Sequence, residues 1–227
     1  MDAVGIIPAR GGSVGIPGKN LAPLAGRPLI AYTLDAARAS TRLGRTFVTT
    51  DDEEIAHVAR EHGADVPFLR SPDLAEAETP MLPVLLDALD RAAPEADVVV
   101  LLQPTSPLRT GAHIDAALEL LERSDADAVV SVVAVPHAFT PGSLVELDER
   151  GVVTPHGPAG PLRRQDKPRL YARNGPAIYA ARVASLRERG DLYGGVTLGY
   201  EMGALDSIDV DGPDELALCE ALLKARA

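Results

Sequence analysis

Short apolar runs alternate with amphipathic helical patterns over the first part of the chain, and this alternation constrains the fold most. The run DVVVLL at Asp97–Leu102 is apolar after its first residue, which is typical of a strand buried on both faces. The other runs that predict strands are Val4–Ile7, Arg45–Thr50, Asp65–Leu69 and Ala128–Val133. Apolar residues at helical spacing predict helices at Arg27–Ser40, Asp52–His62, Thr79–Ala93 and Thr110–Arg123. Strands separated by helices favour an α/β domain with a mostly parallel sheet and helices on both faces.

The pattern changes after Val135, where prolines, glycines and charges replace long apolar runs. We expect a projecting arm at about 136–173, with a hairpin formed by Leu144–Leu147 and Gly151–Val153. Such an arm is rarely stable alone, so we predict that it packs on a partner subunit. The alternative is a long solvated loop, which is uncommon in compact domains. The whole chain, 1–227, is then a single domain that carries this arm.

Regular structure is predicted again in the last part of the chain. Asn174–Tyr179 reads as a strand and Arg182–Glu188 as a short helix. The segment Asp206–Asp211 (DSIDVD) alternates between apolar and acidic residues, as an extended segment does. A final helix is predicted at Asp214–Ala225, with Pro213 in its first turn.

Composition limits the partners and the compartment. The 227-residue chain has a net charge of −11, which argues against nucleic acid as a partner because phosphate backbones require clustered cations. The chain has one cysteine, Cys219, so no internal disulfide can form. It has no apolar run long enough to span a membrane and no basic leader, and we therefore expect no membrane partner and a cytoplasmic location.

A glycine-rich loop follows the first predicted strand, in the stretch VGIIPARGGSVGIPGKN at Val4–Asn20. Its glycines allow sharp turns that expose backbone N–H groups, and two cations, Arg10 and Lys19, flank it. Exposed amides and cations suit a polyanion such as a nucleotide phosphate tail, although a plain surface turn is the simpler alternative. Asn20 follows Lys19, so the loop is not GxxxxGK[ST], and it is not GxGxxG either. The motif therefore supports neither a P-loop ATPase nor a Rossmann dehydrogenase.

Polar residues follow several of the predicted strands. Arg10 follows the first strand, Arg70 the third and Gln103 the fourth, so we expect them to meet at the carboxyl edge of the sheet. In DSIDVD, Asp209 and Asp211 lie on one face of an extended segment, which suits a hard divalent cation. A solvent-facing strand end is the alternative.

Four motifs together identify a family. IIPARGGSxGIPGKN, LLQPTSPLR, YARNGPAIY and DSIDVD, in this order, resemble the cytidylyltransferases that make CMP-activated acidic sugars. The most similar type is the CMP-N-acylneuraminate (CMP-sialic acid) synthetases, with CMP-Kdo synthetases more distant. The resemblance covers about Val4 to Leu222. It implies a Rossmann-like nucleotidyltransferase fold, a homodimer with an exchanged arm, and a requirement for CTP and Mg²⁺.

The resemblance also implies residue roles. The positions that match CTP contacts are Ala9, Arg10, Gly12, Ser13, Lys19, Asn20, Arg70 and Gln103. The positions that match the sugar pocket are Gln103, Thr105, Arg164, Asn174 and Tyr179. Asp209 and Asp211 match metal ligands, and catalysis is expected to depend on Arg10, Lys19 and Asp211.

The implied reaction is an in-line attack by the anomeric hydroxyl of an acidic keto-sugar on the α-phosphorus of CTP, which releases pyrophosphate. Positioned cations and metal should supply most of the catalysis. No His or Glu is placed as a general base, so none is assigned, and His137 is interpreted as structural.

Some positions depart from the family pattern. Val14 replaces the usual loop lysine, Pro80–Leu82 replace frequent serines, Pro136–Pro141 lacks a lysine, and Ala172 replaces an arginine. The acceptor therefore stays open among sialic, legionaminic, pseudaminic and Kdo-like acids and other acidic hydroxyl compounds. A non-catalytic nucleotide- or sugar-binding relative is a second hypothesis. A dinucleotide-dependent oxidoreductase is a third, disfavoured by the absent GxGxxG.

Overall fold

A seven-stranded sheet forms the centre of the computed structural model, which describes residues 1–13, 15–157, 160–161, 163–175, 177–193 and 195–226. Six strands follow one another in the order β11-β6-β10-β5-β1-β4, and β9 pairs with the outer part of β6. Their bounds are β1 Ala3–Pro8, β4 Arg45–Thr49, β5 Val98–Leu101, β6 Ala128–Ala134, β9 Tyr171–Arg173, β10 Tyr179–Arg182 and β11 Thr197–Glu201.

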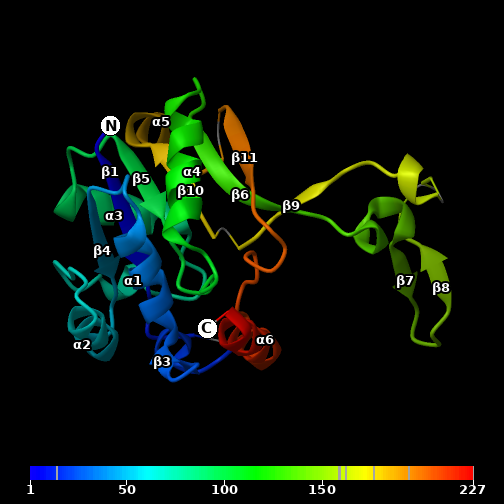
Figure 1. Cartoon of the computed structure of the whole chain (residues 1–227), viewed down its shortest axis with the longest axis horizontal. Coiled ribbons are helices and arrows are strands. Elements are labelled where there is room, and N and C mark those ends of the chain that lie inside the picture. The colour runs from blue at the N-terminus through cyan, green and yellow to red at the C-terminus, as the bar shows by residue number, and fades with distance from the viewer. Residues whose placement is uncertain (14, 158–159, 162, 176, 194, 227) are drawn as a thin grey trace.

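The sheet is mostly parallel, as predicted, but β10 interrupts it. Strands β1, β4, β5, β6 and β11 run one way, whereas β9 and β10 run the other. The chain leaves the sheet at the end of β6 and returns from the arm at that same end, so the next two strands, β9 and β10, run in the reverse direction (Figure 1). β10 thereby fills the gap between β5 and β6.

Helices cover both faces of the sheet. One apolar cluster packs against α1 (Leu29–Ala39), α2 (Glu53–Glu61) and α4 (Gly111–Glu122), and a second packs against α3 (Met81–Ala92) and α5 (Val183–Arg189). Successive strand residues alternate between them, so that Ile7 and Val100 join the first cluster, and Ile6 and Val99 the second. The last helix, α6 (Pro213–Arg226), packs Cys219 into a third cluster with Leu24 and Val210.

Several sequence predictions of strands are wrong in detail. Asp65–Leu69 makes only two isolated bridges, from Asp65 to Phe47 and from Leu69 to Thr50. The strand predicted at Asn174–Tyr179 begins only at Tyr179, and its Pro176 lies outside the described residues. Asp206–Asp211 forms no strand, since the described backbone there donates to another segment only from Val210, to Thr105 O. Strands β9 and β11 and the small β2–β3 hairpin (Pro23–Leu24 and Arg27–Pro28) were not predicted.

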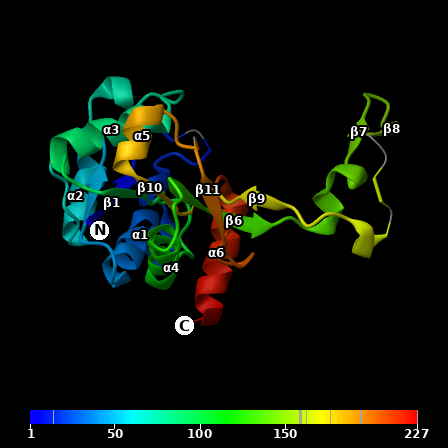
Figure 2. The same ribbon diagram turned by 90° about the horizontal axis from the view of Figure 1, so that it is seen from above.

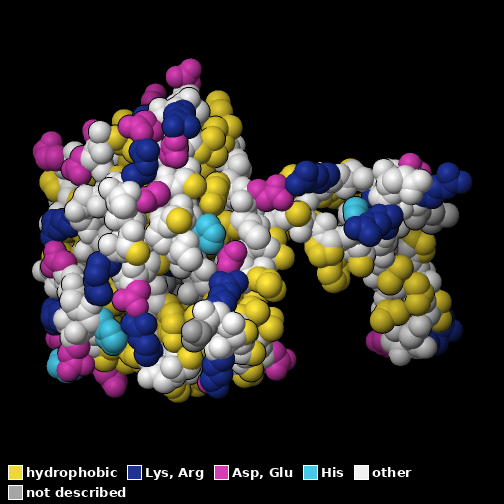
Figure 3. Space-filling model, viewed as in Figure 1, with side chains coloured by type: hydrophobic (Ala, Val, Ile, Leu, Met, Phe, Trp, Pro, Cys, Tyr) yellow, Lys and Arg dark blue, Asp and Glu magenta, His cyan; other side chains and the backbone are white. Residues whose placement is uncertain are grey.

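The arm projects from the sheet on the extended ends of β6 and β9 (Figures 1 and 2). It contains the predicted hairpin, as β7 (Val145–Leu147) and β8 (Val153–Pro155), and three single 3-10 turns, at His137–Phe139, Pro141–Ser143 and Arg164–Asp166. Large apolar side chains cover the hairpin rather than forming a core (Figure 3). Those exposed around the hairpin, between residues 136 and 155, are Phe139, Leu144, Val145, Leu147, Val152 and Val153. Among the helices that the structure describes, none combines the length and apolar character needed to cross a bilayer.

Gly111 provides a test of the packing between α1 and α4. A Cβ atom at this position would lie 2.6 Å from the carbonyl carbon of Ala39 and 2.7 Å from the backbone nitrogen of Ser40. Since backbone atoms cannot move aside cheaply, Gly111→Ala should lower the free energy of unfolding by about 1–3 kcal/mol. Urea unfolding measures the change. Gly12→Ala is the control, because its Cβ would meet no atom within 4 Å, and an equal loss in both variants would contradict the packing argument.

Candidate active site

A cavity of about 540 Å³ opens beside the carboxyl ends of β1 and β5. It brings the glycine-rich loop together with Arg70, Gln103 and Asp211, which are far apart in the sequence. The predicted site residues that line it are Arg10, Ser13, Lys19, Asn20, Arg70, Gln103, Thr105 and Asp211. The convergence expected from strand order is therefore present in the fold.

The glycine-rich loop is fixed by close backbone approaches. Gly11 N–H donates to Oδ1 of Asp51 at 3.1 Å, and a Cβ on Gly11 would lie 2.6 Å from Oδ2 of Asp52. A Cβ on Gly15 would collide with the carbonyl oxygen of Asp211. Asn20 Nδ2 donates to the backbone carbonyl of Arg10 at 2.9 Å, which closes the loop on itself. The loop thus needs glycine where it meets other segments.

The structure also describes two further loop positions, Ala9 and Gly12, that were predicted to contact CTP. Ala9 is buried, and its N–H donates to Thr49 O at 3.0 Å, while Gly12 faces open space. Val14, the departure from the family pattern, lies outside the described residues.

Lys19 joins the loop to the acidic segment near the end of the chain. Its ammonium group donates to Val210 O at 2.8 Å and to Asp211 Oδ1 at 3.3 Å. The lysine side chain is 13% exposed, whereas that of Asp211 is 80% exposed. The carboxylate of Asp211 is therefore anchored on one side and open to the cavity on the other.

Asp209 is the more buried member of the predicted metal pair. Burial, with the charge of Asp211, raises the pKa of its carboxyl to about 6, against the opposing effects of Thr105, Lys19 and Arg109. Its Oδ1 is buried and has no hydrogen-bond partner among the described residues. Such an orphaned oxygen beside a second carboxylate fits a divalent cation.

The donor set suits Mg²⁺ rather than a metal held wholly by protein. Among the described residues there is no group of three or more His, Cys, Asp or Glu side chains placed to hold a metal. Mg²⁺ is commonly bound by one or two carboxylates, with substrate phosphates and waters completing its coordination. Asp209 and Asp211 fit that pattern.

Arg70 is a buried cation with unused donors. Its side chain is buried, and its Nη2 lies 3.5 Å from Oδ1 of Asp51. Burial lowers the pKa of Arg70, and Asp51 opposes that shift. Nε and Nη2 have no hydrogen-bond acceptor among the described residues. A buried guanidinium with free donors at a cavity wall is suited to a ligand that supplies acceptors.

Arg109 supports Gln103 from behind, a role that sequence reasoning missed. Its guanidinium is buried and donates to Gln103 O at 3.2 Å, Ala177 O at 2.6 Å and Thr33 Oγ1 at 2.6 Å. Burial lowers the pKa of Arg109 to about 9, and Asp209 partly offsets this, so the group stays charged at neutral pH. The only sequence signal was its place at the end of LLQPTSPLR.

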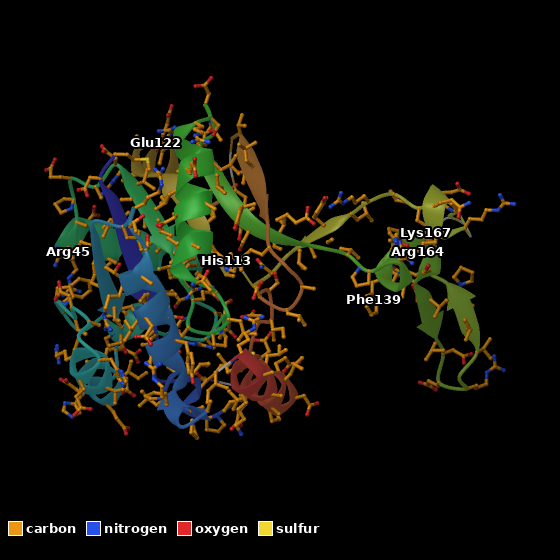
Figure 4. All side chains as sticks on the ribbon, in the orientation of Figure 1. Arg45, His113, Glu122, Phe139, Arg164 and Lys167 are labelled. Carbon is orange, nitrogen blue, oxygen red and sulfur yellow. The ribbon has the colours of Figure 1, made fainter. Side chains whose placement is uncertain are left out.

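The predicted sugar-binding residues do not all meet at the cavity. Thr105 lines it, and Asn174 is buried in a network with Ser131 and Ser207. Tyr179 is buried in the second apolar cluster, and its hydroxyl donates to the carbonyl of Leu192, so in this chain it does not line the cavity as predicted. The reason is that Tyr179 begins β10, where its ring faces the core. Arg164 lies on the arm, away from the cavity of its own chain (Figure 4).

A further wall of the cavity was not predicted as part of the site. It follows Arg70 along the chain and is largely apolar, which suits the face of a flat ring. Its residues are Leu74, Glu76, Ala77, Thr79, Met81 and Val84. The cavity therefore has a polar end at the glycine loop and an apolar end at this wall.

Comparisons with known proteins agree with this geometry. A family model described as Cytidylyltransferase matches residues 4–198. A CMP-N,N'-diacetyllegionaminic acid synthase from Legionella pneumophila is 36% identical over 99% of this chain and 97% of its own length. An N-acylneuraminate cytidylyltransferase from Streptococcus agalactiae is 36% identical over 95% of this chain, and N-acylneuraminate cytidylyltransferase A from Danio rerio is 37% identical over 91%. The chain spans about half the length of these last two, 52% and 47%.

Solved structures share the fold. The structure of a CMP:2-keto-3-deoxy-manno-octonic acid synthetase complexed with CTP matches with a TM-score of 0.75 and 22% identity over the whole of both chains. A 4-diphosphocytidyl-2C-methyl-D-erythritol synthase from Anaerococcus prevotii matches with a TM-score of 0.64 and 13% identity, over 98% of this chain and 96% of its own. The nucleotidyltransferase fold expected from the sequence is thus confirmed. By the family model and by its relatives, the chain belongs to the cytidylyltransferase family.

Proposed function

We propose that this protein transfers CMP from CTP to the anomeric hydroxyl of an acidic keto-sugar of the sialic acid-like, nonulosonic type. The observation that carries the proposal is one cavity lined by the glycine loop, Arg70 and Asp211, with the half-buried carboxyl of Asp209 two residues before Asp211. The legionaminic and N-acylneuraminic acids named for the relatives support the sugar class.

The reaction forms one bond and breaks one. The anomeric oxygen forms a bond to the α-phosphorus of CTP, the bond from that phosphorus to the bridging oxygen breaks, and pyrophosphate leaves. The hydroxyl proton passes to solvent, because no residue is assigned as general base. Bound Mg²⁺, held by Asp209 and Asp211, would neutralise phosphate charge and acidify the hydroxyl.

The residues of this chain would position the triphosphate. The third N–H of Lys19 remains available beyond its two contacts, and none of the described residues forms an ion pair with Arg10. Both can therefore donate to the β- and γ-phosphates as charge grows on the leaving pyrophosphate. The loop positions Ala9, Gly12, Ser13 and Asn20 would line the phosphate path, and Arg70 the base and ribose.

Gln103 would lie where nucleotide and sugar meet. Its backbone is held by Arg109, so its side chain projects from a fixed point beside Thr105. Asn174 is held by a buried network with Ser131 and Ser207.

We further propose that two copies form a homodimer through the arm. The arm exposes apolar side chains such as Phe139 (64% exposed) and Leu147 (69% exposed), which a partner would cover. In that assembly Arg164 would reach the sugar pocket of the partner subunit, a place it does not reach in its own chain (Figure 4).

A screen of acceptors tests the activity. Pyrophosphate release should require CTP, Mg²⁺ and an acidic nonulosonic acid such as sialic or legionaminic acid, and UTP should be a poor substitute. Pseudaminic acid, Kdo and non-sugar acidic hydroxyl compounds form the other arms of the screen. Release with Kdo alone would reassign the acceptor to the Kdo-like class. Tight CTP binding without release with any acceptor would instead indicate a non-catalytic relative.

Removal of the outer metal carboxylate should abolish turnover without unfolding the protein. Asp211→Ala should lower kcat by at least about 100-fold, since it removes a metal ligand from the developing charge. Its side chain is 80% exposed, so the thermal unfolding midpoint should hardly change. Asp214→Ala removes an exposed carboxylate nearby, in the first turn of α6, and is the matched control. Full activity of Asp211→Ala would eliminate the metal role.

Complementation between inactive chains tests the exchanged arm. Arg164→Ala and Asp211→Ala should each be inactive alone. When the two are co-expressed, half of randomly paired dimers are mixed, and each mixed dimer has one intact site, so about a quarter of wild-type activity should return. Steady-state rates on the purified mixture measure this, and light scattering measures the dimer. A mixture as inactive as its components would show that Arg164 does not act across subunits.

A further inference from the structure

Asp51 contacts two walls of the nucleotide cavity although it does not line the cavity itself. Its Oδ1 accepts the N–H of Gly11 at 3.1 Å and lies 3.5 Å from Nη2 of Arg70. Its side chain is only 25% exposed. A single carboxylate oxygen therefore sets the spacing between the glycine-rich loop and Arg70.

Backbone contacts place both walls against the end of β4. Ala9 N–H donates to Thr49 O at 3.0 Å on one side, and Arg70 N–H donates to Thr50 O at 2.7 Å on the other. With these main-chain contacts in place, the carboxylate of Asp51 forms an ion pair with the buried guanidinium of Arg70.

Two donors of the Arg70 guanidinium have a definite geometry, although one of them, Nη2, also lies near Asp51. Nε and Nη2 of Arg70 lack acceptors among the described residues. These neighbouring N–H groups form one planar fork, which suits two adjacent acceptors on a ligand. Cytosine offers such a pair in O2 and N3, whereas N3 of uracil carries a hydrogen. A fork that meets that edge would favour CTP over UTP.

Without Asp51, the guanidinium of Arg70 would be drawn to the phosphates of the nucleotide in competition with its base. Arginine binds phosphate oxygens through the same fork, and the triphosphate enters this cavity. A carboxylate beside the guanidinium lowers its attraction for polyanions and holds it in place. The carboxylate of Asp51, close to a site for a triphosphate, therefore does more than balance the charge of Arg70.

On the basis of the proposed CTP-dependent activity, we propose that Asp51 is a positioning residue that holds Arg70 at the base end of the nucleotide and keeps it from binding phosphate.

Asp51→Asn tests this, since the amide oxygen can still accept the Gly11 N–H while the charge is lost. Calorimetric titration in Mg²⁺ buffer should show that this variant binds tripolyphosphate roughly three- to tenfold more tightly than the wild type. The ratio of its affinity for CTP to its affinity for UTP should fall about threefold or more. A defect that is merely structural would weaken all three ligands.

Two further variants separate the causes. Asp73→Asn removes an exposed charge just before the apolar wall without contacting Arg70, and both quantities should stay within about twofold of wild type. In Asp51→Asn/Arg70→Gln, the tripolyphosphate gain should vanish because the freed guanidinium is gone. A gain that persists in the double variant, or an equal gain in Asp73→Asn, would overturn the proposal.

Arg70→Gln and the wild-type protein cover the cases that Asp51→Asn leaves open. If Asp51→Asn fails to fold, Arg70→Gln alone serves: it should lose CTP preference and keep tripolyphosphate affinity within about twofold. A clear loss of tripolyphosphate affinity there would overturn the role of Asp51. Wild-type protein that binds UTP as tightly as CTP would instead contradict the proposed function.

Discussion

The ammonium group of Lys19 joins two segments that are 191 residues apart, and the cavity depends on this contact. The glycine loop follows the first strand, and the Asp206–Asp211 segment precedes the last helix, so the sheet by itself does not align them. The bond from Lys19 to Val210 O does so, together with the bond from Val210 N–H to Thr105 O at 2.7 Å. The loop amides that we propose for phosphate and the carboxylates that we propose for metal are therefore held together by these two bonds. Their spacing is set before any ligand arrives, which is what electrostatic catalysis requires.

The site also concentrates buried charge that the protein alone does not fully satisfy. Arg70 has two donors without acceptors, and Asp209 has an oxygen without a partner, among the described residues. Each such group costs free energy in the unliganded protein. In the proposed function, a nucleotide with its metal would supply the missing partners, and the deficit would become binding energy. Arg109 differs, because three of its contacts are made within the protein, and it serves to hold the loop at Gln103.

Sequence patterns predicted the strands and helices that have a regular period. β1, β5 and α4 lie within a residue or two of their predicted bounds, because buried strands are continuously apolar and Thr110 is a clear helix cap. The insertion of β10 between β5 and β6 was not readable, since strand order depends on where the arm returns and not on local pattern. Asp206–Asp211 alternates like a strand but finds no neighbour to pair with.

The same distinction holds for the site. Arg10, Lys19, Gln103 and Asp211 were identified because they sit in motifs at strand ends, and the fold places all four at one cavity. Arg109 carries no periodic signal, since a buried arginine and a surface arginine look alike in sequence. Tyr179 was assigned to the sugar by motif, but a residue that begins a central strand has its direction fixed by the sheet.

The arm leaves apolar side chains uncovered in the single chain. Its hairpin exposes Val145 and Leu147 on the same element, and a two-stranded hairpin without a covering layer is marginal in water. Lys167 donates to His137 O at 3.1 Å and to the hydroxyl of Ser143, so the arm has its own polar contacts, but its described residues form no apolar core (Figure 4). Bracing of this kind fixes the shape of the arm, while burial must come from elsewhere. An arm that is shaped but uncovered is best explained by a partner surface, and a second copy of this chain would present two such arms to each other.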